Sequence, residues 1–485
     1  MNLNFRLIKK VTIISLLTIN CISLLSCNQK KNEIRPWPQN PYYWEYNGRP
    51  VILLGGSDDD NLFQWPEEKL EQQLNTLKAS GGNFIRNTMS SRDSGNLDPF
   101  LKLENGLYDL EQWNPEYWRR FKNLLEMTCE RDIIVQIELW DPHDWFRGGS
   151  EPRSNGGWAN RPFNPENNIN YTAAETGLPD SIDYSPIRKG ANNHAFFKTP
   201  GNQKDMSVVL KYQEERIRKI LEISLPYPNV LYCINNESYL SMEWSLYWLK
   251  FVREVAKNLG EEAYITEMRI GPTTDVVTEY GFDYADVSQT ASGLYRKKGT
   301  NTGEGHHRTI KELVENVKED PVPVNSVKQY GGDEYYWTIS SDEGVARVWR
   351  TIFSGQAGVR FHRPTIGLGL NERAQNNIEC LRTITDCFDL KNVNTHQDLE
   401  RLFVSRNPNA AYVMGEKGKV IAVFFTKTGK EVEFDVSSFN GDVSVNWVNT
   451  NTAEWGPTEE FSKNTITLIK PGKKQWAALI KTSEN

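Results

Sequence analysis

The chain has 485 residues, of which 38% are hydrophobic and 11% aromatic, so it can bury a large core and we expect more than one domain. Its formal net charge of −7 is modest, and no run rich in Lys and Arg follows residue 31. Nucleic acid and anionic membrane surfaces are therefore not expected as partners. The 15 Trp and 20 Tyr instead suit a ligand with apolar faces and many hydroxyl groups, although core packing explains many of these rings.

Residues 1–27 are predicted to be a lipoprotein signal peptide. A basic start precedes an apolar run over residues 11–25, which is too short to span a bilayer, and Cys27 follows a Leu-Leu-Ser sequence as in a lipobox. We expect cleavage before Cys27, lipidation of its thiol and anchoring to a bacterial cell envelope, on its periplasmic or outer-membrane face. Residues 28–50 would be the tether and lead-in. Plain cleavage without lipidation is the alternative.

A strand followed by a helix repeats eight times over residues 51–390. A doubly wound sheet also alternates in this way, but no Gly-rich phosphate-binding sequence supports that rival, and eight units match a (β/α)8 TIM barrel with insertions. The expected strands are 51–54, 83–88, 133–140, 230–234, 263–270, 284–289, 322–330 and 358–363. The predicted fold class is therefore α/β, with residues 51–390 as the barrel.

The pattern changes after residue 390. Short runs of alternating apolar residues, separated by Gly, Asn and Lys turns, predict a small all-β sandwich domain over residues 391–485. The expected strands are 410–414, 420–426, 432–436, 443–448, 465–469 and 476–480. We expect this domain to pack against the barrel.

The strand that begins at Val230 carries the most informative sequence, NVLYCINNESYL. Its apolar run ends on Asn236 and Glu237, and the C-terminal end of a buried parallel strand opens at the mouth of a barrel. A carboxylic acid placed there is a candidate catalytic group. A pair of residues that caps a helix is the alternative interpretation.

Further polar and aromatic side chains stand at the other strand ends or in the long loop over residues 146–200. Each of them alone could form a salt bridge or a cap, but their clustering at one end of the barrel predicts a binding site. The predicted substrate-binding residues are Asn236, Asp58, Asp59, Arg86, Trp140, Asp141, His143, Trp158, Lys328, Tyr330, Arg360 and His362. The six His residues form no metal-binding spacing, so we expect neither a metal nor a cofactor, and we expect a monomer.

The Asn236-Glu237 pair, the opening sequence GGSDDDNLFQWP and the C-terminal β domain resemble the apiosidase-like, barrel-fold glycoside hydrolases of clan A. The resemblance covers most of residues 36–485, through short motifs. It implies that Glu237 is the general acid/base and that Asn236 bonds the sugar hydroxyl beside the anomeric carbon.

The chain departs from that family at the seventh strand, where clan A enzymes carry a nucleophilic Glu. The sequence here is PVPVNSVKQYGGDE, and glycoside cleavage usually needs two carboxyl groups. We expect Asp333 to be the second one, because a Gly-Gly turn before it could bring it over the mouth. Glu334 and Glu267 are alternatives, and so is Tyr330 as a nucleophile, since some sialidases use Tyr.

The predicted function is hydrolysis of glycosidic bonds in a complex plant or algal polysaccharide. Glu237 would donate the proton, with its pKa raised by a partly apolar pocket. Arg360, His362 and their cationic neighbours at the mouth suggest a uronate or sulfated sugar, unless internal carboxylates neutralise them. Two alternatives stay open: a polysaccharide lyase, and a glycan-binding lipoprotein on a barrel without activity.

Overall fold

The structure is a computed structural model. It describes residues 33–146, 157–180, 194–201, 206–237, 239–270, 274–291, 302–333, 339–364, 366–393 and 398–483. The predicted signal peptide with Cys27, and the candidate Glu334, lie outside these ranges. Within them, no helix has both the length and the apolar character needed to cross a membrane, and no three metal-ligating side chains are grouped to hold an ion.

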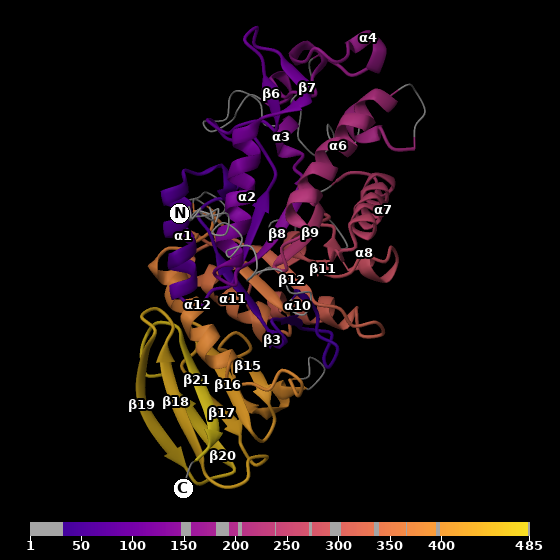
Figure 1. The fold of residues 1–485 in the computed structure, drawn as a ribbon. Coiled ribbons are helices and arrows are strands. Elements are labelled where there is room, and N and C mark those ends of the chain that lie inside the picture. The colour runs from indigo at the N-terminus through magenta and orange to yellow at the C-terminus, as the bar shows by residue number, and fades with distance from the viewer. Residues whose placement is uncertain are drawn as a thin grey trace, which may run out of the picture.

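Eight parallel strands form one sheet that curls into a barrel, with helices around it (Figure 1). In chain order the strands are β4 (Leu53–Gly56), β5 (Phe84–Thr88), β8 (Ile134–Trp140), β9 (Val230–Asn235), β10 (Ile265–Thr266), β11 (Ala285–Asp286), β12 (Val324–Gln329) and β13 (Gly358–Phe361). Every residue of these strands is buried, because helices cover the outer face and packed side chains fill the interior. The predicted fold class is confirmed.

The fifth and sixth strands are much shorter than predicted, with two residues each. Thr266 explains why the barrel still closes between them. Its hydroxyl donates to the carbonyl of Tyr284 over 2.7 Å and accepts from the N–H of Asp286 over 3.1 Å, while the N–H of Asp283 donates to the carbonyl of Ile265 over 2.9 Å. A side chain therefore replaces part of the backbone ladder here.

The main helices follow the barrel strands and bury one apolar face against them. They are α1 (Glu67–Ala79), α2 (Pro115–Cys129), α6 (Ser207–Ser224), α7 (Met242–Leu259), α8 (Asp275–Thr278), α10 (Gly303–Glu315), α11 (Ser341–Phe353) and α12 (Glu372–Thr385). Local chemistry sets where they start: side chains of Asn114, Ser241, Ser340 and Asn371 cap α2, α7, α11 and α12.

Smaller elements extend both ends of the barrel. A three-stranded sheet, β1 (Arg35–Pro36), β2 (Trp44–Tyr46) and β3 (Arg49–Val51), places Trp44 at the N-terminal strand ends, where its indole N–H donates to Asn325 Oδ1 over 3.1 Å. At the other end lie the β6 (Phe100–Lys102) and β7 (Tyr108–Trp113) hairpin, α3 (His143–Phe146), α4 (Ala173–Thr176) and α9 (Ser288–Ala291), with short 3-10 turns η1 (Leu62–Gln64), η2 (Gly157–Asn160), η3 (Pro165–Asn167) and η4 (Ala195–Lys198).

The C-terminal part consists of two antiparallel sheets (yellow in Figure 1). One contains β15 (Ala411–Glu416), β16 (Val420–Phe425), β21 (Trp476–Thr482), β18 (Val443–Asn449) and β19 (Glu454–Phe461), and the other β14 (Phe403–Ser405), β17 (Glu431–Asp435) and β20 (Thr465–Ile469). Alternate residues of the larger sheet join the smaller sheet in one apolar cluster, while the rest join the barrel core. Both faces of the larger sheet are thus buried at β15 and β16, whereas the edge strand β19 is largely exposed.

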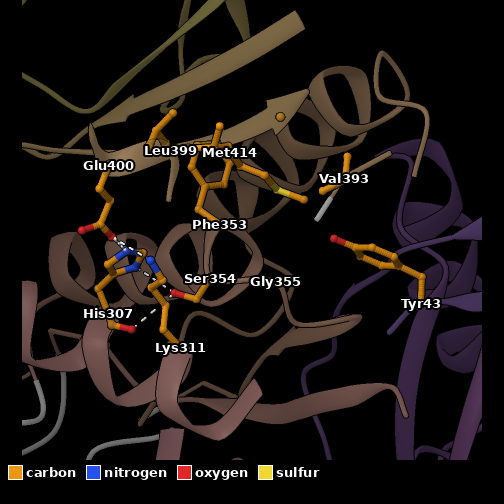
Figure 2. Close-up of a pocket in the computed structure, with 12 residues that line it drawn as sticks. Tyr43, His307, Lys311, Phe353, Ser354, Gly355, Val393, Leu399, Glu400 and Met414 are labelled. Carbon is orange, nitrogen blue, oxygen red and sulfur yellow. Dashed lines mark hydrogen bonds and ion pairs between the residues drawn. The ribbon is translucent and has the colours of Figure 1, made fainter. Parts of the chain in front are cut away.

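The contact between barrel and β sheets combines a ring stack with a polar chain. Trp349 of α11 stacks on Phe424 of β16 at 4.7 Å. Nearby, His307 of α10 has its Nδ1 2.7 Å from the hydroxyl of Ser354 and its Nε2 2.6 Å from Glu400 in the turn η5 (Leu399–Leu402) (Figure 2). These residues line a small cavity between the barrel and the C-terminal sheets.

Candidate active site

Side chains from three barrel strands meet at Glu237, directly after β9. Lys328 of β12 contacts Glu237 Oε1 with its ammonium group, and His143, just after β8, has Nε2 3.1 Å from Glu237 Oε2. The hydroxyl of Tyr330, just after β12, lies 3.5 Å from Oε1. Four residues predicted to share a site are thus brought together at the C-terminal end of the barrel.

The side chain of Glu237 is partly exposed to solvent, and its backbone is strained. Its side chain is 19% exposed, whereas that of Lys328 beneath it is 1% exposed. Its φ of 51° lies in the left-handed region, which costs a non-glycine residue about 1–2 kcal/mol. Such strain persists where the surrounding structure fixes it, often at functional sites.

The electrostatics of Glu237 correct one expectation from the sequence. Burial alone would raise the pKa of this carboxyl, but the ammonium of Lys328 and the hydrogen bond from His143 hold it well below its usual value. The predicted rise in the pKa of Glu237 is therefore wrong: the residue is an anion with two donors. The direction of Lys328 toward Glu237 is not a local property of the sequence, because strand register and barrel closure decide it.

Asn236 connects Glu237 to a second carboxylate. Its Nδ2 donates to Asp141 Oδ1 over 2.9 Å, and its Oδ1 accepts from Lys328 over 2.6 Å. Asp141 is in turn paired with Arg92 at 2.8 Å. Arg92 was not predicted; it lies four residues after β5, and its only sequence signal was a cation close behind a strand end.

A second cluster surrounds Asp60, in the loop after β4. Its carboxylate oxygens lie 2.9 Å from Arg92, 3.1 Å from Arg363, 3.3 Å from Arg360 and 3.6 Å from Arg86. Burial alone would raise the pKa of Asp60, but these cations hold it well below its usual value. One carboxylate thus organises four arginines around the mouth.

Arg360 and His362 were predicted to bind substrate, and the structure encloses both. The Arg360 side chain is 0% exposed and donates to Ser57 Oγ over 3.0 Å and to the Val327 carbonyl over 3.0 Å. His362 lies 3.7 Å from Asp60 and is buried. Arg360 of β13 and His362 directly after it both point into the polar cluster. Asp60 pairs with Arg360, and burial lowers the pKa of His362, which favours its uncharged form. Arg363, one residue further, is 16% exposed, and only its Nε is engaged by Asp60 in the described chain.

Arg86 and Glu138 form a pair inside the barrel. Arg86 NH2 lies 2.9 Å from Glu138 Oε2, and both side chains are 0% exposed. Burial raises the pKa of Glu138 to about 7. Arg86 was predicted to contact substrate, but the structure places it below the mouth, as part of the support for the residues above.

The carboxylates predicted to be the partner of Glu237 are both engaged elsewhere. Asp333 accepts from the N–H and the hydroxyl of Ser341 over 2.8 and 2.7 Å, which ties it to the start of α11. Both oxygens of Glu267 accept from Asn235 Nδ2 over 3.0 Å, and Glu267 is fully buried. The Gly-Gly turn did not swing Asp333 over the mouth, because capping of the next helix holds it.

The predicted aromatic contacts and rim residues also have other partners. Trp140 and Trp158 are fully buried; the Trp140 ring lies 4.7 Å from the guanidinium of Arg216, and the Trp158 indole donates to the Pro179 carbonyl over 2.7 Å. These rings support the wall of the long loop. At the rim, Asp58 accepts from the Leu370 N–H over 2.7 Å, and Asp59 from the Trp65 indole over 2.9 Å.

Comparison with known proteins gives a fold and no family. No protein-family model and no curated protein sequence matches this chain. Among solved structures, a glycoside hydrolase family 5 protein from Bacteroides vulgatus ATCC 8482 is 12% identical, with a TM-score of 0.63 over 94% of both chains. Another, described as a glycoside hydrolase, is 14% identical, with a TM-score of 0.61 over 93% of this chain and 97% of its own.

A family 5 mannosidase from Rhizomucor miehei is 11% identical, with a TM-score of 0.50 over 73% of this chain and 97% of its own. This narrower match leaves out about a quarter of the present chain, whereas the two broader ones span nearly all of it. At such low identities the likeness concerns the backbone alone. The chain therefore shares its barrel, and its nearly full-length architecture, with solved structures of glycoside hydrolases.

Proposed function

We propose that the protein is a glycoside hydrolase and that Glu237 is its essential carboxylate. The observation that carries this proposal is a partly exposed, strained Glu at the C-terminal end of the fourth barrel strand, contacted by groups from the third and seventh strands. The likeness to solved glycoside hydrolases over almost the whole chain supports it. Asn236, whose amide lies between Asp141 and Lys328, is proposed to bond a sugar hydroxyl next to the reacting carbon.

The substrate class we propose is an acidic sugar in a complex plant or algal polysaccharide. Arg86, Arg92, Arg360 and Arg363 gather around Asp60. Arg363 is the partly exposed member of this group, and its terminal nitrogens suit a carboxylate or sulfate. Arg363 therefore replaces Arg360 as the residue proposed to read substrate charge.

The place of action proposed is the bacterial cell envelope, with the chain anchored through lipid on Cys27. The sequence pattern of residues 11–27 supports this proposal. Metabolic labelling with a radioactive fatty acid would test it: label is expected on the full chain and not on Cys27→Ala. Labelling of both forms, or of neither, would contradict the anchor.

The first test is turnover on a panel of acidic and neutral polysaccharides by purified residues 28–485. We expect new reducing ends from the wild type and from Glu319→Gln, an exposed glutamate in the turn after α10, and none from Glu237→Gln. A product that absorbs in the near ultraviolet would instead identify a lyase, because elimination leaves a double bond beside the uronate carboxyl. Binding without turnover, unaffected by Glu237→Gln, would identify a glycan-binding protein.

The charge proposal has its own test. Arg363→Gln should lower kcat/KM on an acidic substrate about tenfold or more relative to its neutral analogue, since one charge-assisted hydrogen bond contributes about 1.5–3 kcal/mol. Arg308→Gln, an exposed arginine on α10, is the matched control. An unchanged ratio of acidic to neutral activity in Arg363→Gln would overturn the proposed substrate class while leaving the hydrolase intact.

A further inference from the structure

We propose that Tyr330 is the nucleophile of this site and that Glu237 is its general base. The inference rests on the proposed glycoside hydrolase function and deepens it. It assigns the role of the missing strand-seven carboxylate to the residue that directly follows β12.

The geometry brings nucleophile and base together. The Tyr330 hydroxyl donates to Glu237 Oε1 over 3.5 Å, which is longer than the roughly 2.6–3.2 Å of a working nucleophile and base, as such pairs often are before substrate is bound. The Tyr330 ring is fixed edge-on against the His362 ring at 4.7 Å. Tyr330 therefore stands at the end of the seventh strand with its oxygen directed at the candidate base, and it is 4% exposed.

Glu237 is held in the deprotonated form that a general base requires. Lys328 contacts one carboxylate oxygen and His143 the other, so the charged form is stabilised from both sides. A residue held as an anion brings no proton of its own, so the proton for the leaving group has to come from Tyr330. Nucleophile, base and the groups that orient the base thus form the same chain of contacts as in other activated hydroxyl nucleophiles.

Substrate charge gives a physical reason for a phenol in place of a carboxylate. A sugar that carries its own carboxylate or sulfate repels an anionic nucleophile in a site of low dielectric constant. A neutral phenol approaches without that repulsion and becomes charged only as its proton leaves for Glu237. Tyr nucleophiles are known among glycosidases, in sialidases.

The reaction balances in two steps. First, the Tyr330 oxygen forms a bond to the anomeric carbon as the glycosidic C–O bond breaks; the phenolic proton moves to Glu237 and from there to the departing oxygen. Second, water attacks the same carbon, its proton passes through Glu237 to the Tyr330 oxygen, and the C–O bond to Tyr330 breaks. Two displacements at one carbon retain its configuration.

The stereochemistry of the product is the first test. Hydrolysis is followed by ¹H NMR on the polysaccharide that the panel identifies, and we expect the first-formed sugar to keep its anomeric configuration. An inverted product would overturn the proposal. If the wild type hydrolyses no polysaccharide, the proposed function is wrong, and so is the assignment of a nucleophile.

Covalent trapping locates the nucleophile without any variant. The wild type is incubated with 2,4-dinitrophenyl 2-deoxy-2-fluoro glycosides, α and β, of glucuronic and galacturonic acid, and the digest is analysed by mass spectrometry. A sugar adduct on Tyr330 is expected. An adduct on Glu237 or Asp333, or no adduct with any of the four probes from an enzyme that hydrolyses with retention, would contradict the assignment.

Substitution provides the quantitative test. Tyr330→Phe should lower kcat at least about a thousandfold with an unchanged melting temperature, and Tyr280→Phe, a surface residue, should behave as wild type. Glu237→Gln should lose activity to a similar degree, because the two residues act as one unit. Substantial activity of folded Tyr330→Phe would overturn the proposal.

Discussion

Two carboxylates at the mouth of the barrel are each surrounded by cations, yet they differ in exposure and strain. Asp60 contacts four arginines and is almost completely buried. Glu237 contacts Lys328 and His143, remains 19% exposed and has a φ of 51°. Both have pKa values well below the usual range.

Pairing with cations is therefore not sufficient to identify a reactive carboxylate. Asp60, in the loop after β4, pairs with arginines on β5 and β13 and in the loops after them, so it fixes these segments relative to one another. Lys328 and His143 each contact one carboxylate oxygen of Glu237, and 19% of its side chain remains exposed and can meet a ligand. Access and backbone strain therefore distinguish the functional carboxylate from the structural one.

The largest expected effect is on stability, from Asp60→Asn. Removing the anion leaves buried arginines without their partner and should cost about 3–5 kcal/mol in the free energy of unfolding. The folded-state pKa of Asp60 is depressed, so its contribution is present above the ordinary pKa of 3.8 and is lost as pH falls below it. Urea denaturation measures the loss. Asp398→Asn, in an exposed pair with Arg401, should cost less than about 1 kcal/mol. Equal losses of unfolding free energy in the two variants would contradict a special structural role of Asp60.

Glu237→Gln should act in the opposite manner, with a large effect on catalysis and a smaller one on folding. We expect kcat to fall about 10³- to 10⁴-fold, the upper part of the usual contribution of general acid–base catalysis. Its loss of unfolding free energy should be smaller than that of Asp60→Asn, because part of Glu237 is already solvated. Activity assays and urea denaturation on both variants test this. A variant that unfolds as easily as Asp60→Asn would make Glu237 a structural residue.

The variant Lys328→Met tests the ionisation of Glu237 through the pH dependence of activity. Without the ammonium group the pKa of Glu237 should rise, by about 1–3 units for the loss of a close opposite charge. If ionised Glu237 is the active form, the acidic limb of the kcat/KM profile moves to higher pH in Lys328→Met. Lys318→Met, in an exposed pair with Glu315, should leave the profile unchanged. A limb that moves to lower pH, or does not move, would argue against an anionic Glu237.

The smallest effect is expected at the joint between the barrel and the β sheets. Glu400→Gln weakens the contact with His307 and should cost about 1 kcal/mol, as for a single hydrogen bond. The His307 hydrogen bond lowers the pKa of Glu400 to about 2 from an ordinary 4.5, so its contribution is present above pH 4.5 and fades as pH falls toward 2. The difference in melting temperature between wild type and variant should shrink from pH 7 to pH 3; a larger difference at pH 3 would contradict this.

Much of the fold could be predicted because hydrophobic period and strand length are local properties. The eight barrel strands were placed within a few residues, apart from the short β10 and β11. Strand β19 was missed: its sequence EWGPTEEF contains Gly and Pro and little apolar alternation, and it is held by pairing with β18. Pairing of that kind is a long-range contact that a local pattern does not contain.

The sequence by itself determined the barrel, the β domain and the candidate Glu237 at a strand end, since each follows from patterns within a few residues. Only the tertiary structure decided which charges meet. It brought Lys328, His143 and Tyr330 to Glu237, enclosed Arg360 and Trp158, and tied Asp333 to Ser341. The physical reason is that the partner of a charged side chain depends on strand register and barrel closure, and these join residues almost a hundred positions apart.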